Sequence, residues 1–170
     1  MIFNATEHPR GAGGLFVPTA RAEPGTTLTA PASPEAVQTR GLEAARDVLA
    51  EFPDLEIMDH SPARRGTVRL EELGDPRLAL GNCWAVTNEV IEEVGAAEFG
   101  TEWLDEITIR RTRLGGQHVA ILAGDRAGYY VIDYTPRQFH LDLSFPFVVG
   151  VEERKAAVER ASGTRWALDD

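Results

Sequence analysis

The chain has 170 residues, of which 43% are hydrophobic, so it can form one domain with a substantial core and is not expected to be disordered throughout. Its 17 basic and 27 acidic residues give a formal net charge of −10, which disfavours binding to nucleic acids or to anionic membranes. With one cysteine, no internal disulfide can form. No membrane-length apolar stretch and no signal-peptide pattern is present, so we expect a cytoplasmic protein.

The N-terminal third contains an arm and a helix. Residues 1–33 are rich in glycine, proline, alanine and threonine without periodicity, which predicts an extended N-terminal arm. Residues 34–170 are predicted to form a single domain. Ser33 suits an N-cap and Pro34 a first helical position, so a helix is predicted from there to Pro53. Residues 54–80 are expected to be irregular, apart from a short strand at 66–70.

The rest of the chain alternates between helical and extended patterns. A helix capped by Asn82 is predicted to run to about Val94, and a last helix is predicted at 152–161. Between them, strands are predicted at the following ranges: 106–112, 117–123, 129–133 and, as a strand or packed loop, 145–149. This order predicts an α+β fold in which the helix after Asn82 packs on an antiparallel sheet.

Three residues in this pattern form a candidate catalytic triad. Cys83 starts a helix, His118 opens one strand and Asp133 ends the next. A hairpin turn centred on Asp125-Arg126 would place His118 directly opposite Asp133, which could accept the Nδ1–H of the imidazole and leave the other nitrogen to the thiol. Taken singly, a cysteine is usually buried core, a histidine structural and an aspartate a turn former. Their conjunction favours a nucleophile, a base and a group that orients the base.

The motifs around these residues resemble a known superfamily. Gly81-Asn82-Cys83-Trp84 resembles the Gly-Gln-Cys-Trp signature of transglutaminases, and the order Cys83, His118, Asp133 resembles the papain-like and transglutaminase-like superfamily. The segment from Asp133 to Phe139, Asp-x-Thr followed by Arg-Gln-Phe, is closer to the papain-fold toxin and glutamine-deamidase domains of bacterial effectors. The resemblance implies a papain-like catalytic domain that acts on a protein substrate.

The implied function is that of a cysteine-dependent amidohydrolase working through a thioester. Cys83 would attack a carboxamide carbon, His118 would transfer the proton and Asp133 would hold His118. Deamidation of a protein glutamine is the preferred reaction, with proteolysis and cross-linking as alternatives of the same fold. Papain proteases carry a glutamine several residues before the cysteine, where this chain has Arg77 and Leu78. This difference argues against proteolysis.

Three further residues near the triad are candidates for binding. Asn82, Trp84 and Gln138 are candidate substrate or oxyanion residues, although capping is the preferred role for Asn82 and Trp84 could equally anchor the helix in the core. The four histidines lack metal-ligand spacing and no second cysteine exists, so neither a metal site nor a cofactor is expected.

A weaker motif lies in the arm. Glu7-His8-Pro9-Arg10-Gly11 followed by Gly14-Leu15-Phe16 resembles segments of phage head-morphogenesis proteins, which implies a phage-derived protein in a host cytoplasm, with an immunity or phage protein as a candidate partner. A disordered arm is the alternative. The competing class of function is a non-enzymatic phage structural or partner-binding domain.

Overall fold

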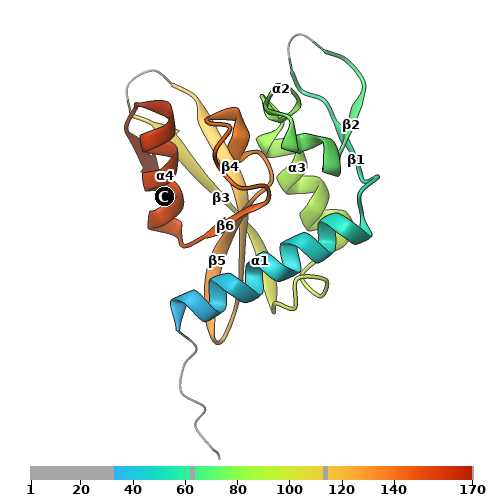
Figure 1. Ribbon diagram of the computed structural model, residues 1–170, viewed down its shortest axis with the longest axis vertical. Coiled ribbons are helices and arrows are strands. Elements are labelled where there is room, and N and C mark those ends of the chain that lie inside the picture. The colour runs from blue at the N-terminus through green and yellow to red at the C-terminus, as the bar shows by residue number, and fades with distance from the viewer. Residues whose placement is uncertain (1–32, 62–63, 113–114, 170) are drawn as a thin grey trace, which may run out of the picture. The chain divides into compact units, whose positions relative to one another are not determined.

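The computed structural model describes residues 33–61, 64–112 and 115–169, so apart from Ser33 the predicted arm and its phage-like segment lie outside the described residues. The fold is mixed α+β, as predicted (Figure 1). The helices are α1 (Pro34–Glu51), α2 (Pro76–Ala79), α3 (Cys83–Glu89) and α4 (Val151–Ser162). The strands are β1 (Glu56–Met58), β2 (Thr67–Arg69), β3 (Trp103–Arg111), β4 (Gln117–Asp125), β5 (Gly128–Asp133), β6 (Phe147–Val149) and β7 (Trp166–Leu168).

Helix α1 confirms the prediction made from its N-terminal residues. The Ser33 hydroxyl accepts a hydrogen bond from the Ala36 amide at 3.2 Å, which satisfies one of the free amides of the first turn. Gly41 interrupts the apolar pattern of the sequence but is buried in the middle of this helix. A Cβ atom at Gly41 would lie 2.4 Å from Cε2 of Tyr130 on β5, so the glycine allows the helix to lie close to the sheet.

The main sheet has five antiparallel strands in the order β6-β5-β4-β3-β7. Ile121 and Ile132 belong to the core that α1 and α3 cover, whereas Ile109 packs with Val158 of α4 and Trp166 of β7. Neighbouring side chains along a strand point to opposite faces, so α3 and α4 lie on opposite sides of this sheet (Figure 1). This arrangement confirms an antiparallel sheet with the Cys83 helix against it.

The predicted hairpin register was wrong by two residues. Ile121 pairs with Ile132 and Asp125 pairs with Gly128, so the turn is centred on Arg126-Ala127. The Asp125 carboxylate fixes this turn by accepting hydrogen bonds from the amides of Ala127 at 2.7 Å and Gly128 at 3.2 Å. A two-residue shift preserves the face of every side chain, so Asp133 still shares a face with His118 but lies diagonal to it.

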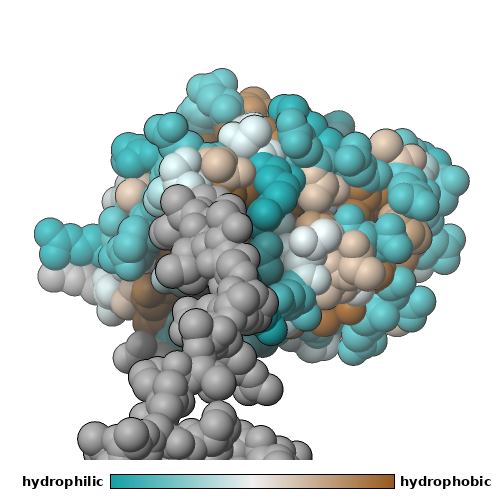
Figure 2. Space-filling model, turned by 90° about the horizontal axis from the view of Figure 1, so that it is seen from below, coloured by the Kyte–Doolittle hydropathy of each residue, from teal (hydrophilic) through white to brown (hydrophobic). Residues whose placement is uncertain are grey.

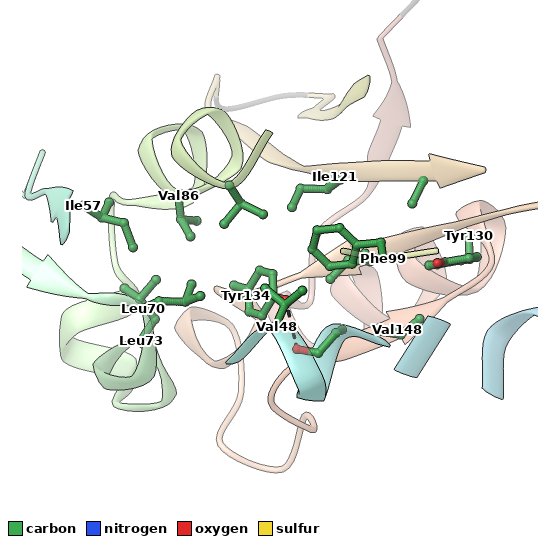
Figure 3. Close-up of a cluster of buried hydrophobic side chains, with 14 of the residues drawn as sticks. Val48, Ile57, Leu70, Leu73, Val86, Phe99, Ile121, Tyr130, Tyr134 and Val148 are labelled. Carbon is green, nitrogen blue, oxygen red and sulfur yellow. Dashed lines mark hydrogen bonds between the residues drawn. The ribbon is translucent and has the colours of Figure 1, made fainter. Parts of the chain in front are cut away.

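One large core fills the space between the sheet, α1 and α3 (Figure 3). Val48 of α1, Val86 of α3 and Ile121 of β4 contribute apolar side chains to it. Tyr134 lies in the same core, and its hydroxyl donates a hydrogen bond to the Ala45 carbonyl oxygen at 3.0 Å. The chain that leaves β5 is therefore tied to α1 directly after Asp133.

The segment 54–80 is more regular than predicted. Strands β1 and β2 form a separate antiparallel pair in which Ile57 lies opposite Val68. The single buried side chain of each short strand points into the main core, so three-residue strands with little periodicity can be held by packing. The Asp75 carboxylate caps α2 by accepting a hydrogen bond from the Arg77 amide at 2.9 Å.

The surface accords with the charged composition of the chain. Figure 2 shows hydrophilic residues over much of the face that it presents, with hydrophobic residues interspersed among them. Across the described residues, none of the helices has both the length and the apolar character needed to cross a bilayer.

Candidate active site

Cys83 is the first residue of α3, as predicted, but Asn82 does not cap the helix with its side chain. The Asn82 side chain turns instead into the preceding loop. Its oxygen accepts from the His60 amide at 2.8 Å, and its nitrogen donates to Asp59 at 3.0 Å and to the Leu78 carbonyl oxygen at 2.9 Å. Because Asn82 is fully buried and its amide group is used in these bonds, the structure does not support a substrate-binding or oxyanion role for it.

Asn82 belongs to a partly buried polar group that we call the loop cluster. Its members are Asp59, Ser61, Arg64 and Asn82. Arg64 Nε donates to one Asp59 oxygen at 2.6 Å, and the Ser61 amide donates to the other at 2.9 Å. The Arg64 bond, with the help of Ser61 and Asn82, outweighs burial and lowers the pKa of Asp59 to about 2. This cluster fixes the chain just before Cys83.

Cys83 lies beside the first part of β4, where, within the described part of the chain, this strand has a neighbouring strand on one side only. Strand β5 ends at Asp133, so among the described residues the first part of β4 is paired with β3 alone. The Cys83 sulfur lies close to the Val119 amide and to the His118 side chain, and both lower the pKa of the thiol. The early end of β5 thus creates the space in which the thiol meets the imidazole.

His118 and Asp133 form a short buried contact. His118 Nε2 lies 2.5 Å from Asp133 Oδ2, and both side chains are 1% exposed. The prediction that Asp133 contacts the ring is confirmed, but the nitrogen was wrong: the carboxylate takes Nε2, which leaves Nδ1 as the ring nitrogen available to the thiol. The other carboxylate oxygen accepts from the Thr135 amide at 2.8 Å and from its hydroxyl at 3.3 Å.

Gln138 lies against the second ring nitrogen. Its Nε2 atom is 3.0 Å from His118 Nδ1 and 3.2 Å from the Thr135 hydroxyl oxygen. The single Thr135 hydroxyl proton points to Asp133, so this oxygen accepts from the Gln138 NH₂ group, and the same NH₂ group donates to Nδ1. The neutral ring therefore carries its proton on Nε2, and its Nδ1 lone pair, which is the base that Cys83 requires, accepts from Gln138. Gln138 thus competes with the thiol for Nδ1.

The imidazole ring is also held by packing. Phe139 meets it edge-on with a centroid distance of 4.7 Å, and Phe139 in turn packs on Trp166 at 5.6 Å. With both nitrogens hydrogen-bonded and an aromatic ring against it, His118 has little freedom to change its rotamer.

Arg154 on α4 is 1% exposed and was not predicted as a site residue from the sequence. Its Nε lies 3.4 Å from Asp133 Oδ2 and its second terminal nitrogen 3.3 Å from the His118 carbonyl oxygen. A helical signal could have found it, because Arg154 lies three and four residues before the buried Ala157 and Val158 and thus shares their face. We call His118, Asp133, Thr135, Gln138 and Arg154 the dyad cluster.

The charges of this cluster shift its ionisation. Burial raises the pKa of Asp133, but the charges of His118 and Arg154 and the surrounding hydrogen bonds outweigh it and lower the pKa to about 2. Burial lowers the pKa of His118, yet the Asp133 carboxylate outweighs burial and raises it overall. Burial likewise opposes ionisation of Cys83, but contact with His118 and the Val119 amide lowers the pKa of the thiol below its ordinary value.

The start of α3 carries an exposed side chain next to the buried cysteine. Trp84 is 48% exposed and meets the His60 ring edge-on at 5.9 Å, so it does not anchor the helix in the core. The first intrahelical bond runs from the Val86 amide to the Asn82 carbonyl oxygen at 3.0 Å. The amides of Cys83 and Trp84 precede that bond in the helix and are therefore candidate donors to an acyl group on the sulfur.

No protein-family model matches this chain, and neither the curated proteins nor the solved structures give a match. The resemblance to papain-fold deamidases therefore stays a prediction from the motifs.

Proposed function

We propose that this protein is a cysteine-dependent amidohydrolase with a papain-like core that deamidates a glutamine side chain of a protein. The observation that carries the proposal is the closeness of the Cys83 thiol to the His118 side chain at the start of β4, together with the contact between His118 and the Asp133 carboxylate at the end of β5. A nucleophile, a base with a defined tautomer and a buried orienting carboxylate are the parts that acyl transfer through a thioester needs.

In the proposed reaction, Cys83 gives its proton to His118 Nδ1 and the sulfur attacks the carboxamide carbon. The amides at the start of α3 stabilise the oxyanion. His118 then protonates the departing nitrogen, the C–N bond breaks and ammonia leaves a thioester. A water molecule gives a proton to His118 and attacks the same carbon, the C–S bond breaks, and a carboxylic acid is released from the restored cysteine.

Ionisation of the site supports this sequence of steps. The pKa of Cys83 is lowered and that of His118 is raised, so their proton exchange is easier than between a free thiol and a free imidazole. In the buried cluster Arg154 balances Asp133, and a thiolate balances an imidazolium. Proton transfer therefore creates no net buried charge.

The experiment incubates the full chain with a bacterial proteome and identifies modified partners by mass spectrometry. We expect glutamine-to-glutamate conversion on intact chains with wild-type protein but not with Cys83→Ala. Cys83-dependent new termini would show a protease, and Cys83-dependent amine incorporation would show a transglutaminase. The absence of all three changes would overturn the enzymatic proposal in favour of a non-enzymatic partner-binding domain.

A further inference from the structure

We propose that Arg154 is a positioning residue that shares the charge of Asp133 and thereby keeps His118 able to both accept and release a proton. The inference deepens the proposed function and rests on it for the meaning of that proton transfer. It concerns a residue on α4 that lies on the opposite side of the sheet from the Cys83 helix.

The geometry gives Arg154 two attachments in the cluster. Its guanidinium approaches the Asp133 oxygen that already holds the imidazole, and it also binds the backbone carbonyl oxygen of His118. The first contact divides one carboxylate oxygen between the imidazole and the guanidinium. The second ties the strand position of His118 to α4. A side chain that served packing alone would not need either contact.

The chemistry of the dyad requires such a counter-charge. A buried carboxylate 2.5 Å from an imidazole stabilises the imidazolium, and without compensation the ring would hold its proton too tightly to act as an acid. A guanidinium on the same oxygen weakens that attraction and stays protonated. It also prevents Asp133 from taking the proton itself, since its positive charge favours the ionised carboxylate.

Other charged groups near His118 do not supply this effect. The thiol of Cys83 approaches from α3, and Gln138 contributes a neutral amide. Across the sheet the His118 position pairs with Ile109 of β3, and the Arg111 guanidinium of that strand stacks on Trp166 at 5.2 Å. The remaining charged groups have partners of their own. Asp59 and Arg64, before α3, form an ion pair with each other, and Glu159 of α4 accepts a hydrogen bond from the Trp166 amide.

The test follows the imidazole signals of His118 by NMR across a pH titration of the full chain. In Arg154→Met we expect the His118 midpoint to rise by about one pH unit or more, because an opposing charge a few ångströms away has been removed. Arg160→Met, which removes an exposed arginine from the same helix, is the matched control and should leave the midpoint unchanged. An unchanged His118 midpoint in folded Arg154→Met would overturn the proposal.

A second pair of variants keeps the test decisive if Arg154→Met does not fold. Asp133→Asn leaves Arg154 without a counter-charge, whereas Asp133→Asn/Arg154→Met contains neither buried charge. We expect the His118 midpoint to be higher in the double variant than in Asp133→Asn, and equal midpoints would contradict the proposal. Neither titration measures turnover, so a missing deamidase activity and a missing Arg154 effect are separate results.

Discussion

The loop cluster and the dyad cluster each contain an almost inaccessible carboxylate bound by an arginine, yet they suit different tasks. Asp59 and Asp133 both have a pKa of about 2. All the bonds that Asp59 accepts come from an arginine, a backbone amide and a side-chain amide, none of which changes charge near neutral pH. Asp133 also holds an imidazole. A buried carboxylate therefore fixes structure or tunes reactivity according to whether a titratable partner shares it.

Asp133→Asn should show the largest difference in role between the two clusters. We expect Cys83-dependent turnover to fall by about four orders of magnitude, because an amide can stabilise the wrong tautomer and cannot stabilise the imidazolium. The unfolding free energy should fall by about 3–5 kcal/mol, since Arg154 is left buried without its counter-charge. Turnover by the mass-spectrometric assay and urea unfolding measure the two effects.

Adding Arg154→Met to Asp133→Asn is the control for that variant. The double variant should regain much of the lost stability but none of the turnover. Near-wild-type turnover in Asp133→Asn would show that Asp133 is a turn residue and that the triad is wrong.

Asp59→Asn should affect stability without affecting reactivity. Loss of the charge-assisted bond to Arg64 should lower the unfolding free energy by about 1.5–3 kcal/mol. The rate of Cys83 alkylation by iodoacetamide at neutral pH should stay close to that of wild type. If alkylation slows as much as in Asp133→Asn, the loop cluster takes part in the chemistry and the comparison between the clusters fails.

The loss of unfolding free energy at low pH should reflect both carboxylates. Each has a native pKa of about 2 against an ordinary value of 3.8, so its stabilisation is fully present above about pH 4 and is lost as the pH falls toward 2. The raised pKa of His118 acts in the opposite sense: its contribution is present below 6.5 and is lost as the pH rises through the native pKa. Urea midpoints measured from about pH 2.5 to 8 should fall at low pH because of the carboxylates and at high pH because of His118. Midpoints that stay constant below about pH 4 would contradict the lowered pKa values of the two carboxylates.

Gln138 should give the smallest effect and sharpen the account of the tautomer. Its NH₂ group favours the neutral ring, so Gln138→Leu should raise the His118 midpoint and increase alkylation of Cys83 near pH 6 by roughly fivefold, the equivalent of one hydrogen bond. Gln138→Glu offers an acceptor in place of the donor and should increase alkylation further. Slower alkylation in both variants would mean that Gln138 assists the base rather than competing with the thiol.

The sequence predicted those parts of the site that depend on local pattern. Cys83 at a helix start, His118 opening a strand and Asp133 ending the next follow from caps, alternation and turn residues. The side-chain face of Asp133 was also predicted, because the error in register was an even number of residues.

Features that depend on contacts between distant segments could not be predicted in this way. Asn82 has the residue type of an N-cap, but the His60 amide and Asp59, from a loop more than 20 residues earlier, bind its side chain instead. Arg154 follows two glutamates and precedes a lysine, a pattern typical of a solvated face, and its role depends on α4 lying over β5. Strand β7 is held by pairing with β3 rather than by a strong pattern of its own.

The close approach of α1 to Tyr130 has a consequence for attempts to stabilise this domain. Replacing glycine by alanine within a helix is a routine stabilising change that gains about 0.5–1 kcal/mol through backbone entropy. At Gly41 the added methyl group would overlap the Tyr130 ring, so the helix would have to move away from the sheet. The position at which local propensity is weakest is thus one of the tightest tertiary contacts, and a consensus of helix-forming residues would be a poor guide to improving this protein.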